Sequence, residues 1–515
     1  MNASDALIKT LVSNGLEVIF ANPGTSEMHL VASIDNNPEI RPVLGLFEGV
    51  VTGAADGYAR MAEKSAANLL HLGPGLGNGF ANIHNAKKAR SPLLNIVGDH
   101  ATYHLKHNAP LTSDLDNLAK SSSDWVGRSK SSEDICDLAN IAWQQANSLP
   151  GQISTLIVPA DSAWGEFKGN IPKPLKKEEF ASIDEQLIPN SAEVLKVDNS
   201  ILYLGGKFLN EECVNLAAKI ASKTGCRLVT DTFVSRIRRG EGLPVLEQIP
   251  YFAESAADFL KDSSGIVFIG SRPPVSFFAY PDKKSYLTPP ETNIVNLCSA
   301  EQDGLYALNS LVDEIGANKI NKNLLQTSVS DVPKSGVLDA SNLGLLIANL
   351  MPENSIVSDE AATSSFLVTP QALKAKPHDW LCLTGGSIGQ GLPLAVGAAI
   401  AKPERPVITL HGDGGAMYTV QALWTQAREN LNITNIIFAN HSYEILKIEL
   451  SRVGAVKTGK RADSMFSLDN PKLDWIKLSQ SMGVPCYEPK TVEEFIKTFS
   501  SCVSEDGPST ILIQM

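Results

Sequence analysis

The composition is that of an ordinary globular protein with several domains. The chain has 515 residues, 43% hydrophobic and 19% charged, with a formal net charge of −12. A single hydrophobic core rarely supports such a length, so we expect about three domains. The acidic balance disfavours a nucleic-acid surface. No apolar run approaches the ~20 residues that a membrane-spanning helix needs, so we expect no membrane partner.

The cysteines and the first residues bear on the compartment. The seven cysteines are an odd number without Cys-x-x-Cys spacing, which indicates reduced thiols and no zinc site. The first residues include Asp5 and no basic segment ahead of an apolar stretch, which is not typical of a signal peptide. We therefore expect a cytoplasmic protein.

Strand and helix patterns alternate over residues 1–170, the first predicted domain. The pattern predicts these elements in chain order: helix 4–14, strand 18–21, strand 42–47, helix 49–60, strand 67–72, a glycine-rich turn, a helix ending at 89, strand 93–97 and a last strand within 151–159. The stretch 172–191 is rich in Pro, Lys and Glu and predicts a linker.

Two further units follow. The middle domain is predicted at 192–320, with strands at 201–204, 227–230 and 265–269, and a polar linker at 321–334 leads to the last domain at 335–515. Alternation of this kind predicts the α/β class, with three open parallel-sheet domains.

The last domain contains a candidate metal-diphosphate site. Strands predicted at 407–410 and 433–439 flank a helix at 420–430, so they form a βαβ unit whose strands end at one edge of the sheet. Asp413 and Asn440 follow these strands and can face one another. Carboxylate, amide and carbonyl oxygens suit Mg²⁺. Three glycines would let the backbone approach a diphosphate closely: Gly412, Gly414 and Gly415.

This pattern resembles the thiamine-diphosphate (ThDP) signature of the 2-oxo acid decarboxylases and carboligases, a family that includes acetolactate synthases and benzoylformate decarboxylases. The family often has two consecutive asparagines where this chain has Ala439-Asn440. The resemblance implies that Asp413 and Asn440 bind Mg²⁺ through side chains and Ser442 through its carbonyl. It also places Tyr443 beside the cofactor.

The resemblance extends to residues outside the metal loop. Glu48, after a predicted strand, resembles the glutamate that activates ThDP by hydrogen bonding its aminopyrimidine ring. Glyoxylate carboligase lacks this glutamate, which argues against that branch. In the segment 384–393, the resemblance makes Ile388 the wedge that bends the cofactor and Gly386 a carbonyl acceptor for its amine. Diphosphate contacts are expected from a further loop: Ala361, Ala362 and Thr363.

Substrate-facing residues follow from the same resemblance. Thr25 aligns with a residue that contacts the substrate carboxylate, and His71 with an active-site histidine of benzoylformate decarboxylase that transfers protons. A second histidine of that enzyme has no counterpart in 273–281, which offers aromatic residues instead. The Arg-Gln-Trp-Gln element of acetolactate synthases is also absent, so Ile445 and Leu446 are expected to line an apolar substrate pocket.

Three hypotheses remain open. The first is a ThDP- and Mg²⁺-dependent lyase or transferase that decarboxylates a 2-oxo acid and releases an aldehyde or ligates a second carbonyl compound. The second is an FAD-dependent oxidase of the pyruvate oxidase kind, although we do not expect FAD, because Gly205-Gly206 is too little for a dinucleotide fingerprint. The third is a catalytically silent relative. The resemblance implies a homodimer or homotetramer with active sites between subunits.

Overall fold

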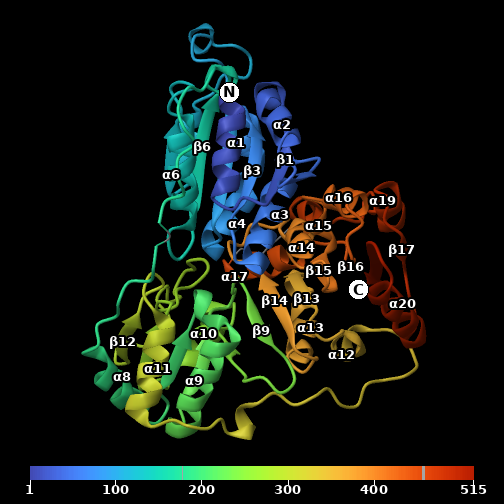
Figure 1. The fold of residues 1–515 in the computed structure, drawn as a ribbon. Coiled ribbons are helices and arrows are strands. Elements are labelled where there is room, and N and C mark those ends of the chain that lie inside the picture. The colour runs from blue at the N-terminus through green and yellow to red at the C-terminus, as the bar shows by residue number, and fades with distance from the viewer. Residues whose placement is uncertain (177, 455–458) are drawn as a thin grey trace.

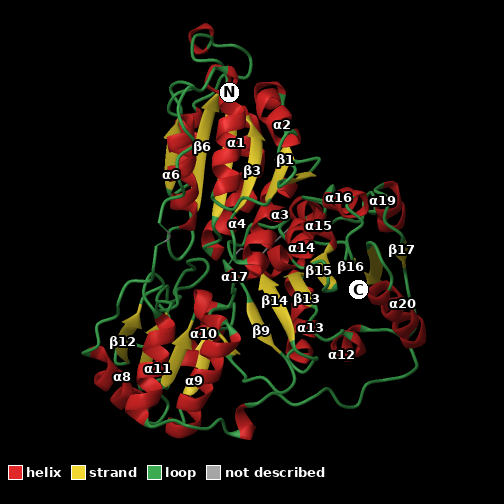
Figure 2. Ribbon diagram, viewed as in Figure 1, coloured by secondary structure: helices red, strands yellow, loops and turns green. Residues whose placement is uncertain are grey.

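Three open α/β sheets, each flanked by helices, make up the computed structural model, which describes residues 1–176, 178–454 and 459–515 (Figure 1). The first unit (blue) lies at one end, the middle unit (green and yellow) at the other, and the third unit (orange and red) packs against both. Figure 2 shows the helices covering the sheet faces. The predicted fold class is confirmed.

The first sheet has six parallel strands in the order β2-β1-β3-β4-β6-β5. Its strands are β1 (Val18–Asn22), β2 (Arg41–Leu44), β3 (Ala66–His71), β4 (Leu93–Asp99), β5 (Trp125–Arg128) and β6 (Ile153–Pro159). Its helices are α1 (Ala3–Ser13), α2 (Met28–Asp35), α3 (Glu48–Ala62), α4 (Leu72–Ala89), α5 (Leu115–Ser122), α6 (Ile135–Asn147) and α7 (Ala160–Trp164). Every residue of β4 and β6 is buried, as central strands covered on both faces require.

The middle sheet has five parallel strands in the order β10-β8-β7-β11-β12. Its strands are β7 (Ile201–Leu204), β8 (Arg227–Thr230), β10 (Glu247–Gln248), β11 (Gly265–Ile269) and β12 (Asn293–Cys298). Its helices are α8 (Leu187–Leu195), α9 (Glu211–Thr224), α10 (Ala253–Leu260) and α11 (Gly304–Ile315). The three strands predicted here have the predicted bounds, whereas α8 begins inside the predicted linker.

The third sheet has seven strands in the order β17-β18-β16-β15-β13-β14-β9. Its strands are β9 (Ile237–Arg239), β13 (Ile356–Glu360), β14 (His378–Cys382), β15 (Val407–Gly412), β16 (Ile433–Ala439), β17 (Cys486–Tyr487) and β18 (Ser509–Gln514). Its helices are α12 (Ala340–Leu350), α13 (Ser365–Ala372), α14 (Gly391–Ala401), α15 (Asp413–Ala416), α16 (Ala422–Arg428), α17 (Glu444–Arg452), α18 (Lys460–Phe466), α19 (Trp475–Ser481) and α20 (Val492–Ser504). This sheet is mixed, because β9 leaves the middle segment of the chain and pairs antiparallel with β14.

Two predicted elements differ from the structure in ways that affect the site. The glycine-rich turn expected after β3 is the first turn of α4, which begins at Leu72. Pro74 is tolerated there because the first N–H groups of a helix need no partner within it. Glu48 is the first residue of α3 and not the end of a strand, since β2 stops at Leu44.

Helices α3 and α14 join the first unit to the third at a close crossing. A Cβ on Gly57 would lie 2.0 Å from the carbonyl oxygen of Leu394, and one on Gly397 would lie 1.8 Å from that of Ala54. Both helices belong to one hydrophobic cluster, so the two units share a core.

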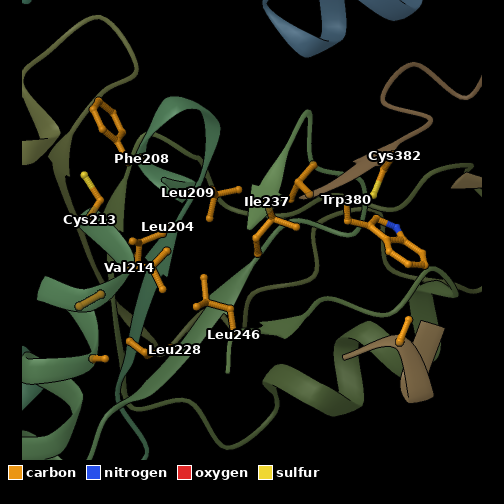
Figure 3. Close-up of a cluster of buried hydrophobic side chains, with 14 of the residues drawn as sticks. Leu204, Phe208, Leu209, Cys213, Val214, Leu228, Ile237, Leu246, Trp380 and Cys382 are labelled. Atoms are coloured by element: carbon orange, nitrogen blue, oxygen red, sulfur yellow. The ribbon is translucent and has the colours of Figure 1, made fainter. Parts of the chain in front are cut away.

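A second cluster joins the middle unit to the third. It runs from Leu204 and Phe208 of the middle unit to Trp380 and Cys382 of β14, and Ile237 of β9 lies between these groups (Figure 3). Among the described residues, no helix is both long and apolar enough to cross a membrane.

Candidate active site

Asp413 and Asn440 lie beside one another at the carboxyl ends of β15 and β16. The two strands are paired in parallel up to Gly412 and Phe438. Asp413 Oδ2 accepts a hydrogen bond from the backbone N–H of His441 (2.9 Å), and Oδ1 accepts one from the N–H of Gly414 (2.9 Å). The predicted metal-binding residues are therefore brought together, as the βαβ geometry required.

The same turn positions the other oxygens. Asn440 Oδ1 accepts a hydrogen bond from the N–H of Ser442 (3.0 Å), and Ser442 Oγ donates to the Phe466 carbonyl (3.2 Å). Burial raises the pKa of Asp413, against the opposing effect of the backbone N–H groups of His441 and Gly414. A nearby cation would offset this cost of burying the carboxylate.

The glycines of the loop make room for neighbouring groups. A Cβ on Gly414 would lie 2.5 Å from the ring of Tyr443, and one on Gly415 would lie 2.8 Å from Glu360 Oε1. Tyr443 therefore packs on the loop that carries Asp413. Gly412 lies in a more open place, since a Cβ on it would have no neighbouring atom of the described residues closer than 3.9 Å.

Glu360 is a structural residue that the sequence analysis did not single out. It ends β13 opposite His411 of β15, and its buried carboxylate accepts hydrogen bonds from the N–H groups of Gly389, Gln390 and Gly391 (2.6–2.7 Å). Burial alone would raise its pKa, but His411 and these N–H groups outweigh burial and lower it. The charged carboxylate thus fixes the start of α14 and the loop before it.

The loop of residues 384–390 is held from the first unit of the same chain. Asn85 donates to the carbonyl of Ser387 (2.7 Å) and accepts from its N–H (3.1 Å). The buried ion pair Asp56–Arg60 extends to this loop, because Gln390 donates to Asp56 (2.7 Å) and Arg60 donates to Thr384 Oγ1 (3.0 Å). These contacts order the backbone on which the predicted cofactor residues stand.

Two of those residues lie on the loop itself. Gly386 is exposed with a φ of +72°, a conformation that favours glycine, and Ile388 is half-buried. A Cβ on Gly386 would lie 2.8 Å from the ring of Phe277 of the middle unit. Aromatic residues of the middle unit therefore reach the predicted cofactor loop.

The predicted diphosphate loop after β13 differs in detail from the expectation. Ala361 is buried and its N–H already donates to Asp359 Oδ1 (3.1 Å), so this N–H is not free for a phosphate. Ala362 is exposed with a φ of +50°, and Thr363 is half-buried. Of these three residues, only Ala362 and Thr363 have appreciable solvent-accessible surface that a ligand could contact.

Glu48 and His71 lie close together in the first unit. Both approach Gly75, whose Cβ would lie 3.4 Å from Glu48 Oε1 and 3.5 Å from the Cβ of His71. Glu48 is 7% exposed, and its Oε2 accepts a hydrogen bond from Asn78 (3.0 Å). The structure thus brings together the first residue of α3 and the last residue of β3.

Glu27 is a second residue that the sequence analysis missed. Its buried carboxylate lies 2.8 Å from His71 Nδ1 and accepts hydrogen bonds from the N–H of Gly24 (2.8 Å) and from Ser26 Oγ. An ionised carboxylate only accepts, so Nδ1 of His71 is the donor in its contact with an ionised Glu27. Thr25 begins the same turn and is exposed.

Gly98 is what allows Glu27 to turn inward. A Cβ on Gly98 of β4 would lie 1.7 Å from Glu27 Oε1. The sequence feature that permits the buried position of Glu27 is therefore a glycine 71 positions away, and no local sequence pattern connects the two residues.

The predicted substrate residues lie on α17, where Ile445 is half-buried and Leu446 is 45% exposed. The helix is anchored to the middle unit: Tyr280 Oη donates to Glu449, and Arg452 forms an ion pair with Glu254 (2.6 Å). The helix is therefore in direct contact with aromatic residues of the middle unit, and the Arg452 guanidinium lies 4.4 Å from the ring centre of Phe252.

The residues thus form two groups, one around Glu48 and His71 and one around Asp413 and Asn440. Within the described parts of the chain, no hydrogen bond or ion pair joins the two groups directly. No cluster of three or more His, Cys, Asp or Glu side chains suited to a metal occurs among the described residues either. A metal at Asp413 would accordingly depend on amide and backbone oxygens.

The comparisons with known proteins agree with this arrangement. Residues 1–119 match the N-terminal TPP binding domain of thiamine pyrophosphate enzymes, and residues 363–513 match the C-terminal TPP binding domain. The chain is 44% identical over 514 residues to the putative acetolactate synthase large subunit IlvX of Mycobacterium tuberculosis, covering 99% of this chain and 98% of that protein. The chain belongs to the thiamine pyrophosphate enzyme family.

Other relatives lie further away. Benzoylformate decarboxylase of Pseudomonas aeruginosa is 25% identical and covers 98% of this chain and 97% of its own. The fold matches the Rhodococcus jostii thiamine diphosphate-dependent 4-hydroxybenzoylformate decarboxylase with a TM-score of 0.86 at 23% identity, covering 100% of this chain and 99% of that one. The predicted family is confirmed.

Proposed function

We propose that the protein is a ThDP- and Mg²⁺-dependent enzyme that decarboxylates a 2-oxo acid and either releases the aldehyde or joins the fragment to a second carbonyl compound. The observation that carries the proposal is the pair Asp413 and Asn440 at the ends of adjacent strands, together with Glu48 and His71 at one place in the first unit. Bound ThDP supplies the nucleophilic carbon and the electron sink for decarboxylation.

Mg²⁺ fits the residues around Asp413. One buried carboxylate with a raised pKa, one amide oxygen and one backbone carbonyl, from Asp413, Asn440 and Ser442, form an all-oxygen donor set. Mg²⁺ prefers such donors and fills its remaining positions with water and phosphate oxygens. Gly414 and Gly415 leave room for Tyr443 and Glu360 beside this loop, and Gly412, which faces open space, would let the backbone approach those phosphates.

ThDP fits the loops on either side of Asp413. Gly386 would accept from its amine and Ile388 would support its bent form, with Tyr443 packed behind. The backbone N–H groups of the exposed Ala362 and the half-buried Thr363 would approach the diphosphate, and the buried Ala361 would support them from the core.

Glu48 would hold a proton for the aminopyrimidine ring. Asn78 orients its carboxyl group by a hydrogen bond to Oε2, which leaves Oε1 toward Gly75 and His71. A single hydrogen-bonded orientation is what a proton-transfer group needs, because transfer depends steeply on distance.

His71 would move protons to and from the reacting carbon. Glu27 keeps the proton on Nδ1, so Nε2 can accept a proton and return it. Thr25, exposed on the neighbouring turn, would bind the substrate carboxylate through its hydroxyl group.

The substrate side chain would be apolar. Ile445 and Leu446 present apolar atoms on α17, and Phe277 lies against Gly386. No charged partner for a polar side chain is offered by these three residues, so branched or aromatic 2-oxo acids suit the site.

A complete site would need two subunits. The Glu48 and Asp413 groups are separate in one chain, which supports a homodimer or homotetramer with sites between subunits. The domains would be 1–170, 192–320 and 335–515, the first for the pyrimidine and the last for the diphosphate. The free cysteines support action in the cytoplasm.

The test is carbon dioxide release by the purified protein with ThDP and Mg²⁺ across pyruvate, 2-oxobutyrate, branched-chain 2-oxo acids and benzoylformate, with products identified by mass. We expect turnover of an apolar 2-oxo acid, and none by the matched Asp413→Asn variant. Silence of the wild-type protein across the panel, with ThDP shown to bind, would contradict the proposal and favour a silent relative.

A further inference from the structure

Arg239 is a buried cation at the edge of the third sheet, in β9. The residue is 4% exposed, and its guanidinium stacks on the ring of Trp380 at 3.8 Å. Neither Nε nor Nη2 has a hydrogen-bond partner within residues 1–176, 178–454 and 459–515. Burying a charge in this way costs free energy unless a counter-charge or a hydrogen-bond acceptor is present.

The neighbouring groups do not supply that counter-charge. Asp359 acts on Arg239 only at a distance, since its carboxylate accepts hydrogen bonds from Ser365 Oγ (2.5 Å) and the N–H of Ala361. Asp379 is held by Arg236 (2.8 Å) and Arg405 (2.5 Å). Within the described chain, no carboxylate forms an ion pair with Arg239.

Two further neighbours are neutral. Burial and the charge of Arg239 lower the pKa of His378 to about 3, and burial raises the pKa of Cys382 to about 11. Burial lowers the pKa of Arg239 itself only to about 10, so it is charged at neutral pH. A positive charge without an ion pair among the described residues therefore lies inside the protein.

A cavity opens beside this charge. It lies between the segment that follows β9, the linker near Gln326 and the end of α13, and Gln248 and Gln326 provide amide groups in its lining beside Arg239. Its other walls are mostly apolar, and its centre has room for about one water-sized particle. Gly240 closes one side tightly, because its φ is +134° and a Cβ there would lie 2.8 Å from the carbonyl oxygen of Ala375.

We propose that this cavity is a binding site for a small monoanion of the halide class, held by the guanidinium of Arg239. The size of the cavity excludes a phosphate group as the structure stands, whereas a halide ion is close to water in size. Arg239 lines the cavity and would hold the ion through its guanidinium group. Gln248 and Gln326 also line the cavity. Each already donates one amide N–H to a backbone carbonyl, that of Thr232 or of Thr327 (3.3 Å in both cases), and would offer its second N–H to the ion.

A bound ion at Arg239 would affect how the middle unit is attached to the third unit. β9 comes from the middle segment of the chain and pairs with β14 of the third sheet, with Arg239 opposite His378. Neutralising Arg239 would strengthen the attachment of the middle unit to the third unit. This proposal does not depend on the proposed catalytic function, because the site lies in the sheet edge and not among the catalytic residues.

The experiment compares thermal unfolding of the full chain in sodium chloride and in sodium gluconate at equal ionic strength, since gluconate is too large for the cavity. We expect a saturable rise of about 2 °C in Tm with chloride only. The Arg239→Met variant should lose this rise, and the control Arg461→Met, which removes an exposed arginine on α18, should keep it.

Crystals of the wild-type protein soaked in bromide give an independent test that does not require any variant to fold. An anomalous peak in the cavity beside Arg239 is expected. Equal Tm in chloride and gluconate, an equal chloride effect in Arg239→Met, or a water without anomalous signal in the cavity would each overturn the proposal.

Discussion

Replacing Glu27 should show that this buried carboxylate, and not the histidine alone, makes His71 effective. Glu27 accepts three hydrogen bonds, from the N–H of Gly24, from Ser26 Oγ and from His71 Nδ1. A buried donor that loses its partner costs about 1–3 kcal/mol. Because His71 is partly exposed and water can replace part of the loss, we expect Glu27→Ala to lower the free energy of unfolding by about 3–5 kcal/mol.

Glu27→Gln separates shape from charge. The amide keeps the volume but offers only one oxygen to three donors, so the expected loss of unfolding free energy is smaller, about 1–3 kcal/mol. We also expect kcat to fall about 10-fold or more with KM little changed, since His71 loses the partner that fixes its tautomer. Urea unfolding and steady-state kinetics on the best 2-oxo acid measure the two quantities.

A double-mutant cycle with His71→Ala completes the test. If Glu27 acts through His71, Glu27→Gln should have little further effect on kcat once His71 is absent. Equal kcat for wild type and Glu27→Gln, or fully additive losses in the double variant, would refute the reasoning.

Three other changes test neighbouring parts of the account. Gly98→Ala should reproduce the kinetic defect of Glu27→Gln, because the new Cβ would displace Glu27 Oε1; normal kcat in that variant would contradict the packing. Asp56→Ala should lower the unfolding free energy by about 3–5 kcal/mol in urea titrations, since it removes the carboxylate that forms an ion pair with the buried Arg60, whereas a loss near zero would show that the pair is dispensable. Burial holds the pKa of Asp413 above 3.8 without a metal, so Asp413 itself favours folding at low pH and loses that contribution as the pH rises through the raised pKa. Protons then compete with Mg²⁺, and the Tm increase given by Mg²⁺ with ThDP should shrink as the pH falls toward that pKa; a pH-independent increase would argue against Asp413 as a ligand.

Much of the fold could be predicted because the central strands are continuous apolar runs. β7, β8, β11 and β16 have the predicted bounds, and each is buried along nearly its whole length. β9 could not be predicted in the same way. It contains three residues, two of them arginines, and its strand conformation depends on pairing with β14 far along the chain.

The residues of the candidate site also differ in whether local sequence or distant partners fix their positions. Asp413 and Asn440 could be placed together from the sequence because one βαβ unit fixes both. Glu27 and Glu360 could not, since their partners come from other elements: Glu27 depends on His71 and Gly98, and Glu360 depends on the start of α14. Buried carboxylates of this kind become recognisable only when the donors around them are known.

The most direct test of the central claim is the rate at which bound ThDP exchanges its thiazolium proton for deuterium, compared between wild type and Glu48→Gln. Our account predicts that both proteins bind ThDP with Mg²⁺ and that exchange slows by orders of magnitude in the variant, because Glu48 no longer supplies a carboxyl group to the aminopyrimidine ring. Equal exchange rates with equal ThDP binding would contradict the role of Glu48 and, with it, the proposed active site.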